Sequence, residues 1–139
     1  MKSYWDTSAA INAVVSPDVM KRLKTGEHVT SPHMFAEFFA IMTGRGIPVL
    51  DAEGKTARLK LTGNDCARWL RSFKLDVKIV DLNAEEVLDG LGKAQVMNVQ
   101  GGHVYDYLHA LAAGKAKADE LLTRNTDDFR EFFRHVAWP

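Results

Sequence analysis

Short strand-like runs alternate with helix-like runs along this chain, and this alternation limits the fold more than any other feature. The strand-like runs cover residues 2–5, 28–30, 78–81, 120–123 and, as a candidate edge strand, 136–138. Strands that are separated by helices pair in parallel, and both faces of such a sheet must be covered. The sequence therefore predicts an α/β fold with a parallel sheet between layers of helices.

The intervening helices have recognisable start and stop signals. Ser31 and Pro32 form a capping serine followed by proline at the first helical position, and Asn83 with Glu86 forms a capping-box pair. The predicted helices cover residues 7–15, 18–24, 33–42, 64–75, 103–115 and 126–134, with one more after Asn83. Residues 47–60 contain Pro48 and Gly54 as breakers, so we expect an irregular surface excursion there.

Composition narrows the class of protein. The length of 139 residues suits one domain over residues 1–139, and Lys+Arg equals Asp+Glu at 18 each. The net charge of zero argues against a protein that binds nucleic acid non-specifically through a basic surface. An enzyme that acts on nucleic acid remains open, because a bound metal can neutralise phosphates locally. Cys66 is the only cysteine, which excludes a disulfide or a thiolate-rich zinc site. Because no membrane span or signal peptide is visible, we expect a cytoplasmic protein.

Acidic residues stand where separate parts of the chain should converge. Asp6 follows the first strand, and Asp127 with Asp128 follows the strand at 120–123. In parallel α/β sheets, ligands bind beyond the carboxyl ends of the strands. Glu37 and Asp106 lie within helices that the fold could bring to the same edge. Carboxylates held together cannot all stay ionised without a cation, so the sequence predicts a site for a hard divalent metal, Mg²⁺ or Mn²⁺.

Each acid also has a structural interpretation. Asp6 is a good helix cap, and a capping aspartate can still offer its second oxygen to a metal. Asp106 and the aspartate pair at 127–128 could stabilise helix dipoles. Glu37 has apolar neighbours almost all round, so we expect it to be largely buried. A buried carboxylate needs a partner, either a metal or a salt bridge to Arg45 or another cation.

Other reactive or aromatic residues are assigned to packing. His103 and His109 flank Asp106 at three residues on either side and could contact substrate or act as a general base, but partly buried, hydrogen-bonded histidines are the favoured interpretation. Cys66 lies on an amphipathic helix, which favours packing over nucleophilic chemistry. The core or an interface, rather than a base-stacking platform, is also the expected place for Trp5, Trp69, Tyr105 and Tyr107.

Taken in order, four segments resemble the PIN-domain family and, within it, the VapC-type toxins of bacterial toxin–antitoxin pairs. They are residues 5–10 (WDTSAA), 31–32 (SP) with 36–38 (AEF), 104–110 (VYDYLHA) and 122–129 (LTRNTDDF). Each segment is weak evidence by itself, but all four in this order are fairly specific. The resemblance implies a three-layer α/β/α sandwich around a parallel sheet of four or five strands. It also implies a metal-dependent ribonuclease, usually homodimeric, that a small antitoxin protein inhibits.

The resemblance assigns roles by position. Asp6 and Asp106 correspond to the main metal ligands, and Glu37 and Asp128 complete the catalytic cluster. Asp128 is preferred to Asp127 because it directly precedes Phe129, as in the family's Asp-Phe pair, although the sequence chemistry leaves open which aspartate faces the site. The polar residues expected to support ligands, bound water or substrate are Thr7, Ser8, Thr123, Asn125 and Asp127. Arg45 or Arg124 could contact phosphate, although surface solvation is the favoured role.

Three alternatives stay open at this stage. A related nuclease in RNA maturation or on structured DNA would share the same residues. A non-catalytic PIN-fold binding module would tolerate loss of the acids, whereas all four positions are acidic here. An α/β phosphotransfer domain also gathers aspartates at strand ends, but it would need a late lysine beside a strand, and none follows Lys117. The RNA target cannot be read from the chain.

Overall fold

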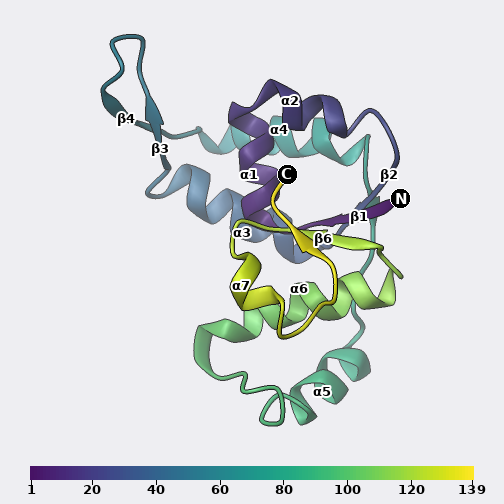
Figure 1. Ribbon diagram of the computed structural model, residues 1–139. Helices are drawn as coiled ribbons and strands as arrows, with labels where there is room; N and C mark the ends of the chain where they lie inside the picture. The colour runs from purple at the N-terminus through teal and green to yellow at the C-terminus, as the bar shows by residue number, and fades with distance from the viewer.

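A parallel sheet of five strands forms the centre of the molecule (Figure 1), as a computed structural model of residues 1–139 describes it. The strands are β1 (Lys2–Trp5), β2 (Glu27–Thr30), β5 (Lys78–Ile79), β6 (Glu120–Leu122) and β7 (Val136–Ala137), in the order β5-β2-β1-β6-β7. Every neighbouring pair is parallel, and Tyr4 of the central strand is in register with Val29 on one side and Leu121 on the other. The predicted parallel sheet, including the edge strand, is confirmed.

Seven α-helices cover the two faces of the sheet. They are α1 (Thr7–Val15), α2 (Pro17–Arg22), α3 (Pro32–Thr43), α4 (Gly63–Lys74), α5 (Ala84–Gly92), α6 (Val104–Lys115) and α7 (Thr126–Phe129), and the 3₁₀ turn Gly101–His103 precedes α6. Helices α1 to α4 lie on one side and α5 to α7 on the other (Figure 1). The neighbours Trp5 and Tyr4 point to opposite faces of β1 and belong to two separate apolar cores. The expected three-layer α/β/α arrangement is confirmed.

A β-hairpin replaces the irregular excursion that we expected at residues 47–60. Strands β3 (Ile47–Leu50) and β4 (Thr56–Leu59) pair antiparallel and project beyond the end of α3 (Figure 1). The expectation was wrong because Pro48 was read as a breaker, whereas an isolated edge strand tolerates proline. Gly46 allows the turn into β3: its φ is +68°, and an added Cβ would lie 2.3 Å from the carbonyl oxygen of Leu59.

Helix α3 is buried along one stripe only. Met34, Phe38 and Met42 are fully buried at four-residue spacing, while Phe39 is 44% exposed. The expectation that Glu37 is largely buried is therefore wrong, because only one face of α3 meets the core. Glu37 is consequently half-buried, with 30% of its side chain exposed.

The remaining local predictions are mostly confirmed. Asn83 and Glu86 form the capping box at the start of α5. The helix predicted over residues 126–134 is too long, since α7 ends at Phe129. Cys66 packs in the core. Among the aromatic residues, Trp5 and Tyr107 are buried, whereas Tyr105 is half-exposed. No helix combines the length and the apolar character that crossing a membrane would require.

Candidate metal centre at the carboxyl edge of the sheet

Asp6 connects the central strand to the first helix. Its backbone N–H donates to the carbonyl of Leu122 at 3.1 Å, which ties the end of β1 to the end of β6. Its side chain caps α1, because Oδ1 accepts hydrogen bonds from the hydroxyl of Ser8 at 2.8 Å and from the N–H of Ala9 at 2.9 Å. The capping interpretation is therefore correct. Both of these hydrogen bonds go to Oδ1, so the cap itself does not use Oδ2.

Burial makes the charge on Asp6 costly. The residue is almost completely enclosed, and this desolvation raises the pKa of its carboxyl group above the ordinary value. The charge of His109 and hydrogen bonds from Thr123, Ala9 and Ser8 oppose this rise but do not cancel it. A nearby cation would remove the remaining penalty.

Asp106 lies within electrostatic range of both Asp6 and Asp128. Asp106 is in the first turn of α6, and its pKa is raised by burial and then by the negative charge of Asp6. The charge of Asp128 raises it further, whereas His109 and His103 lower it. Asp128 itself is exposed at the start of α7. The pKa of Asp106 thus responds to two carboxylates from other elements, that of Asp6 at the start of α1 and that of Asp128 in α7.

Asp127 has a different environment from Asp128. Its side chain is 90% exposed and forms an ion pair with Arg130 at 2.8 Å. Such an exposed pair, three residues apart on a helix, contributes little stability. Of the two neighbouring aspartates, Asp128 is therefore the one with an electrostatic connection to Asp106.

Glu37 is held by residues of both helical layers. Its Oε1 accepts a hydrogen bond from the hydroxyl of Thr7 at 2.8 Å and lies 2.6 Å from Nε2 of His109. Burial alone would raise the pKa of Glu37, but the hydrogen bond and charge of His109, then Thr7 and His33, lower it overall. The expected partner Arg45 forms no salt bridge with it, and two histidines take that place.

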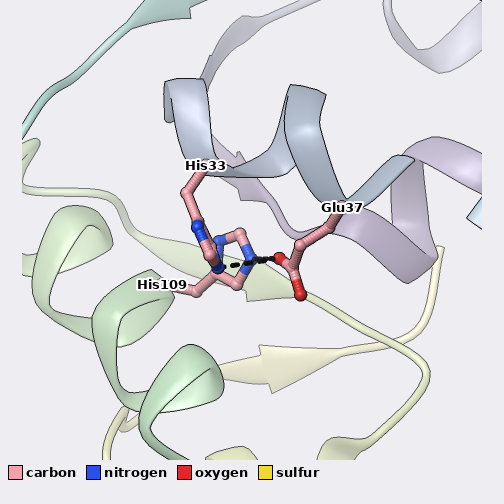
Figure 2. Close-up of side chains that lie close together, drawn as sticks. All are labelled: His33, Glu37 and His109. Carbon is pink, nitrogen blue, oxygen red and sulfur yellow. Dashed lines mark hydrogen bonds and ion pairs between the residues drawn. The ribbon is translucent and has the colours of Figure 1, made fainter. Parts of the chain in front are cut away.

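His33, Glu37 and His109 together form a group that could hold a metal ion (Figure 2). Their ligand atoms all lie within 4.8 Å of one another. Nε2 of His33 is 3.3 Å from Oε1 of Glu37, yet it is a buried atom without a hydrogen bond of acceptable geometry. An imidazole nitrogen without a partner beside a carboxylate is a good ligand for Mn²⁺ or Zn²⁺.

The surroundings of His109 fix its orientation. The ring is almost fully buried, and Nδ1 lies 2.7 Å from the hydroxyl of Tyr4, which donates to Oγ of Ser31 at 2.9 Å. Because the carboxylate of Glu37 can only accept, Nε2–H of His109 donates to Oε1 of Glu37, while Nδ1 contacts the Tyr4 hydroxyl. Such outer contacts hold a histidine ligand in position and select its tautomer.

The polar residues predicted as supports divide into two groups. Thr7 and Ser8 contact Glu37 and Asp6 directly. Thr123 is fully buried at the end of β6; its hydroxyl lies 3.4 Å from that of Ser8 and accepts from the N–H of Asn125 at 3.1 Å. Asn125 is exposed and makes no side-chain cap, so it faces open space beside the cluster.

The histidines are the part of the site that sequence reasoning undervalued. The expectation that His109 is buried and hydrogen-bonded is correct, but its partner is the candidate ligand Glu37. His33 was overlooked, although it lies four residues before Glu37 and must share its helix face. That spacing, in a helix already suspected of carrying a ligand, was the available signal.

Comparison with known proteins identifies the fold. No family model matches the sequence, and no curated protein matches it. Among solved structures, a chain of VapBC2 from Rickettsia felis, crystallised with a DNA fragment from the promoter, is 16% identical at a TM-score of 0.64, covering 99% of this chain and 97% of that one. A chain of VapBC-1 from nontypeable Haemophilus influenzae is 18% identical at a TM-score of 0.64, covering 99% of this chain and 96% of that one. The chain thus has the PIN-like fold expected from its motifs.

Proposed function

We propose that this chain is a metal-dependent endoribonuclease and the toxin of a type II toxin–antitoxin pair, with residues 1–139 as one nuclease domain. The observation that carries the proposal is that buried Asp6 and half-buried Asp106 interact at the carboxyl edge of the sheet, with Asp128 also near Asp106. Glu37 adjoins them, since it accepts a hydrogen bond from Thr7, the residue after Asp6. Burial destabilises the ionised forms of Asp6 and Asp106, which favours a bound cation.

The residues present fit a divalent metal. Asp6 and Asp106 would be the main ligands, because burial raises the pKa of both carboxyl groups and a cation would stabilise their ionised forms. Asp128 and Glu37 would complete the cluster, and the adjoining histidines extend its donor set from oxygen to nitrogen. When bound, Mg²⁺ or Mn²⁺ supplies Lewis acidity toward a phosphodiester and lowers the pKa of water.

The chain's own groups would position the reactants. The hydroxyls of Ser8 and Thr7 hold Asp6 and Glu37 in fixed orientations, which saves reorganisation when RNA binds. Thr123 supports the same carboxylate from β6. Asn125 is exposed beside the cluster and is free to contact RNA. Glu37, whose pKa is lowered by His109 and Thr7, would remain ionised and could accept a hydrogen bond from bound water or ligate a metal.

The toxin assignment rests on the fold shared with VapBC chains, whose structures are complexes. We propose a cognate antitoxin protein as the natural partner, a homodimer as the active form, and cytoplasmic RNA as the substrate. Exposed apolar side chains suit a protein partner, since Phe39 on α3 and Leu88, Leu91 and Val96 on and after α5 are all more than 40% exposed.

A cleavage assay with metal titration tests the proposal. The purified chain, free of antitoxin, is expected to cut RNA internally with Mg²⁺ or Mn²⁺ and to stop when EDTA is added. Calorimetry is expected to detect Mn²⁺ binding, and expression with the neighbouring genes should yield a complex with a small protein that suppresses cleavage. Absence of Mn²⁺ binding at millimolar metal would contradict the nuclease and favour the binding module. Cleavage without an inhibitory partner would favour RNA processing.

A further inference from the structure

A cavity of about 480 Å³ lies next to the acidic residues, on the side of the projecting hairpin. Its walls come from α1, the end of α3, the hairpin β3–β4 and the segment after β6, together with Trp138. Its polar lining includes Asn12, Arg45, Arg58, Arg124 and Asn125, and none of the lining residues is acidic. We call this cavity the arginine groove.

The arginines of the groove are not neutralised. Arg45, Arg58 and Arg124 have no carboxylate within ion-pair distance, whereas eight other lysines and arginines of the chain have one. Arg58 donates through Nε to the carbonyl of Arg45 at 3.1 Å, which leaves its two terminal nitrogens for a ligand. In a chain of zero net charge, this concentration of unpaired cations marks a binding site for anions.

The groove is continuous with the acidic residues. Ser8 lines the groove and also donates to Oδ1 of Asp6. The backbone N–H of Arg124 donates to Oγ of the same serine at 2.8 Å. A chain molecule whose phosphodiester lies at Asp6 would therefore pass directly into the arginine groove on leaving the site.

The hairpin shapes one wall of the groove. Arg58 is paired in register with Pro48, so both groove-lining residues lie at the same level of the ribbon. Gly46 closes the base of the hairpin in a conformation that other residues avoid. The position of Arg58 thus depends on a local fold and not only on a flexible side chain.

Resting on the nuclease function proposed above, we propose that the arginine groove binds the single-stranded RNA segment next to the cleaved phosphodiester. Phosphates lie against Arg45, Arg58 and Arg124, and an unstacked base packs on Trp138, which is 46% exposed. The side-chain amides of Asn12 and Asn125 face the base edges. The volume of about 480 Å³ lies within the range of small-ligand pockets, about 300–1,000 Å³, and suits a short piece of an unpaired strand.

An acidic peptide is the other occupant that three arginines could attract. The strand of RNA is favoured because the groove combines arginines with an exposed indole and two amides, which are groups that bind phosphates, stack on bases and pair with base edges. Its continuity with Asp6 also places the bound phosphates one after another along a path to the acids.

The test measures binding of a short fluorescent single-stranded RNA to the full chain in EDTA, by anisotropy over a range of salt concentrations. Arg45→Gln, Arg58→Gln and Arg124→Gln are each expected to weaken binding about five- to tenfold and to reduce the salt slope by about 0.7. Trp138→Leu is expected to weaken binding about tenfold with an unchanged slope, and Trp138→Phe to restore part of it. Arg71→Gln is the matched control, because Arg71 is exposed, unpaired and outside the groove.

The outcomes separate this inference from the proposed function. If the glutamine variants, shown by circular dichroism to be folded, bind RNA as the wild type does, the inference is overturned, even if the chain cleaves RNA. If poly-glutamate binds through the arginines and RNA does not, the inference is also overturned, in favour of an acidic peptide. If RNA binding depends on the arginines but no metal supports cleavage, the groove assignment holds and the nuclease proposal fails.

Discussion

The acidic residues and the arginine groove adjoin at Ser8, but they are built in different ways. Asp6, Asp106 and Asp128 extend from the ends of strands or the first turns of helices, where the parallel sheet fixes their positions. The groove instead depends on a hairpin outside the sheet and on Trp138 near β7. RNA cleavage should therefore depend on residues of the α/β/α sandwich, whereas RNA affinity should depend on the hairpin and on Trp138. Mutations in the two regions are expected to impair the two properties separately.

The largest expected effect is the loss of cleavage without loss of binding. Asp106→Asn should lower the rate of RNA cleavage about a hundredfold or more, since it removes a proposed metal ligand while keeping the shape of the side chain. Affinity for single-stranded RNA in EDTA should not fall, because the removed charge repels phosphate. Single-turnover cleavage with saturating Mn²⁺ measures the rate, and Asp89→Asn, at an exposed position on α5, is the control. Undiminished cleavage by the Asp106→Asn variant would show that this aspartate is not needed for catalysis.

The next effect concerns which metal the site prefers. His33→Ala should weaken Mn²⁺ binding about tenfold and Mg²⁺ binding much less, because imidazole nitrogen is a better ligand for the transition metal. Calorimetric titration of each metal gives the two affinities. His135 is exposed on the surface, so His135→Ala serves as the control. Equal losses for both metals would mean that His33 only orients Glu37.

A smaller effect on RNA affinity is expected from a substitution of Gly46, at the base of the hairpin. Gly46→Ala combines a positive φ with a Cβ that would meet the carbonyl of Leu59, so it should cost about 1–3 kcal/mol of local stability and displace Arg58. RNA affinity should fall a few-fold, while the single-turnover rate at saturating RNA stays the same. Gly54→Ala has a positive φ of +77° with nothing within 4 Å, so it tests strain without the clash. If Gly46→Ala and Gly54→Ala bind RNA with the same affinity, RNA binding in the groove does not depend on the turn at Gly46.

The smallest effect is on the stability of the metal-free protein. The pKa of Asp6 is raised by burial, so between the ordinary and the raised pKa the folded chain keeps a proton that the unfolded chain has lost. Stability therefore falls as pH rises through this window. Asp6→Asn keeps the cap and removes the charge, so in EDTA it should raise Tm by about 2–6 °C at neutral pH, with the gain vanishing in acid. Thermal melts across a pH series measure this difference. A Tm loss at every pH would show that the carboxylate itself stabilises the fold.

Local sequence patterns predicted most of the α/β/α sandwich. The strand positions, the capping box at Asn83 and the cap at Asp6 are local signals, because they depend on residues that are neighbours in the chain. The hairpin was missed because residues 47–50 (IPVL) show no apolar–polar alternation in the sequence and Pro48 was read as a breaker. The alternating burial of this strand, and the pairing with residues 56–59 that tolerates Pro48, are visible only in the structure.

The sequence by itself determined which residues end strands and begin helices, and therefore which acids could meet at the carboxyl edge of the sheet. Only the tertiary structure decided that Glu37 pairs with His109 across 72 positions, and that Arg58 of the hairpin shares a cavity with Arg124. The physical reason is that capping and periodicity act between near neighbours, whereas ion pairing and cavity walls depend on how separate layers pack.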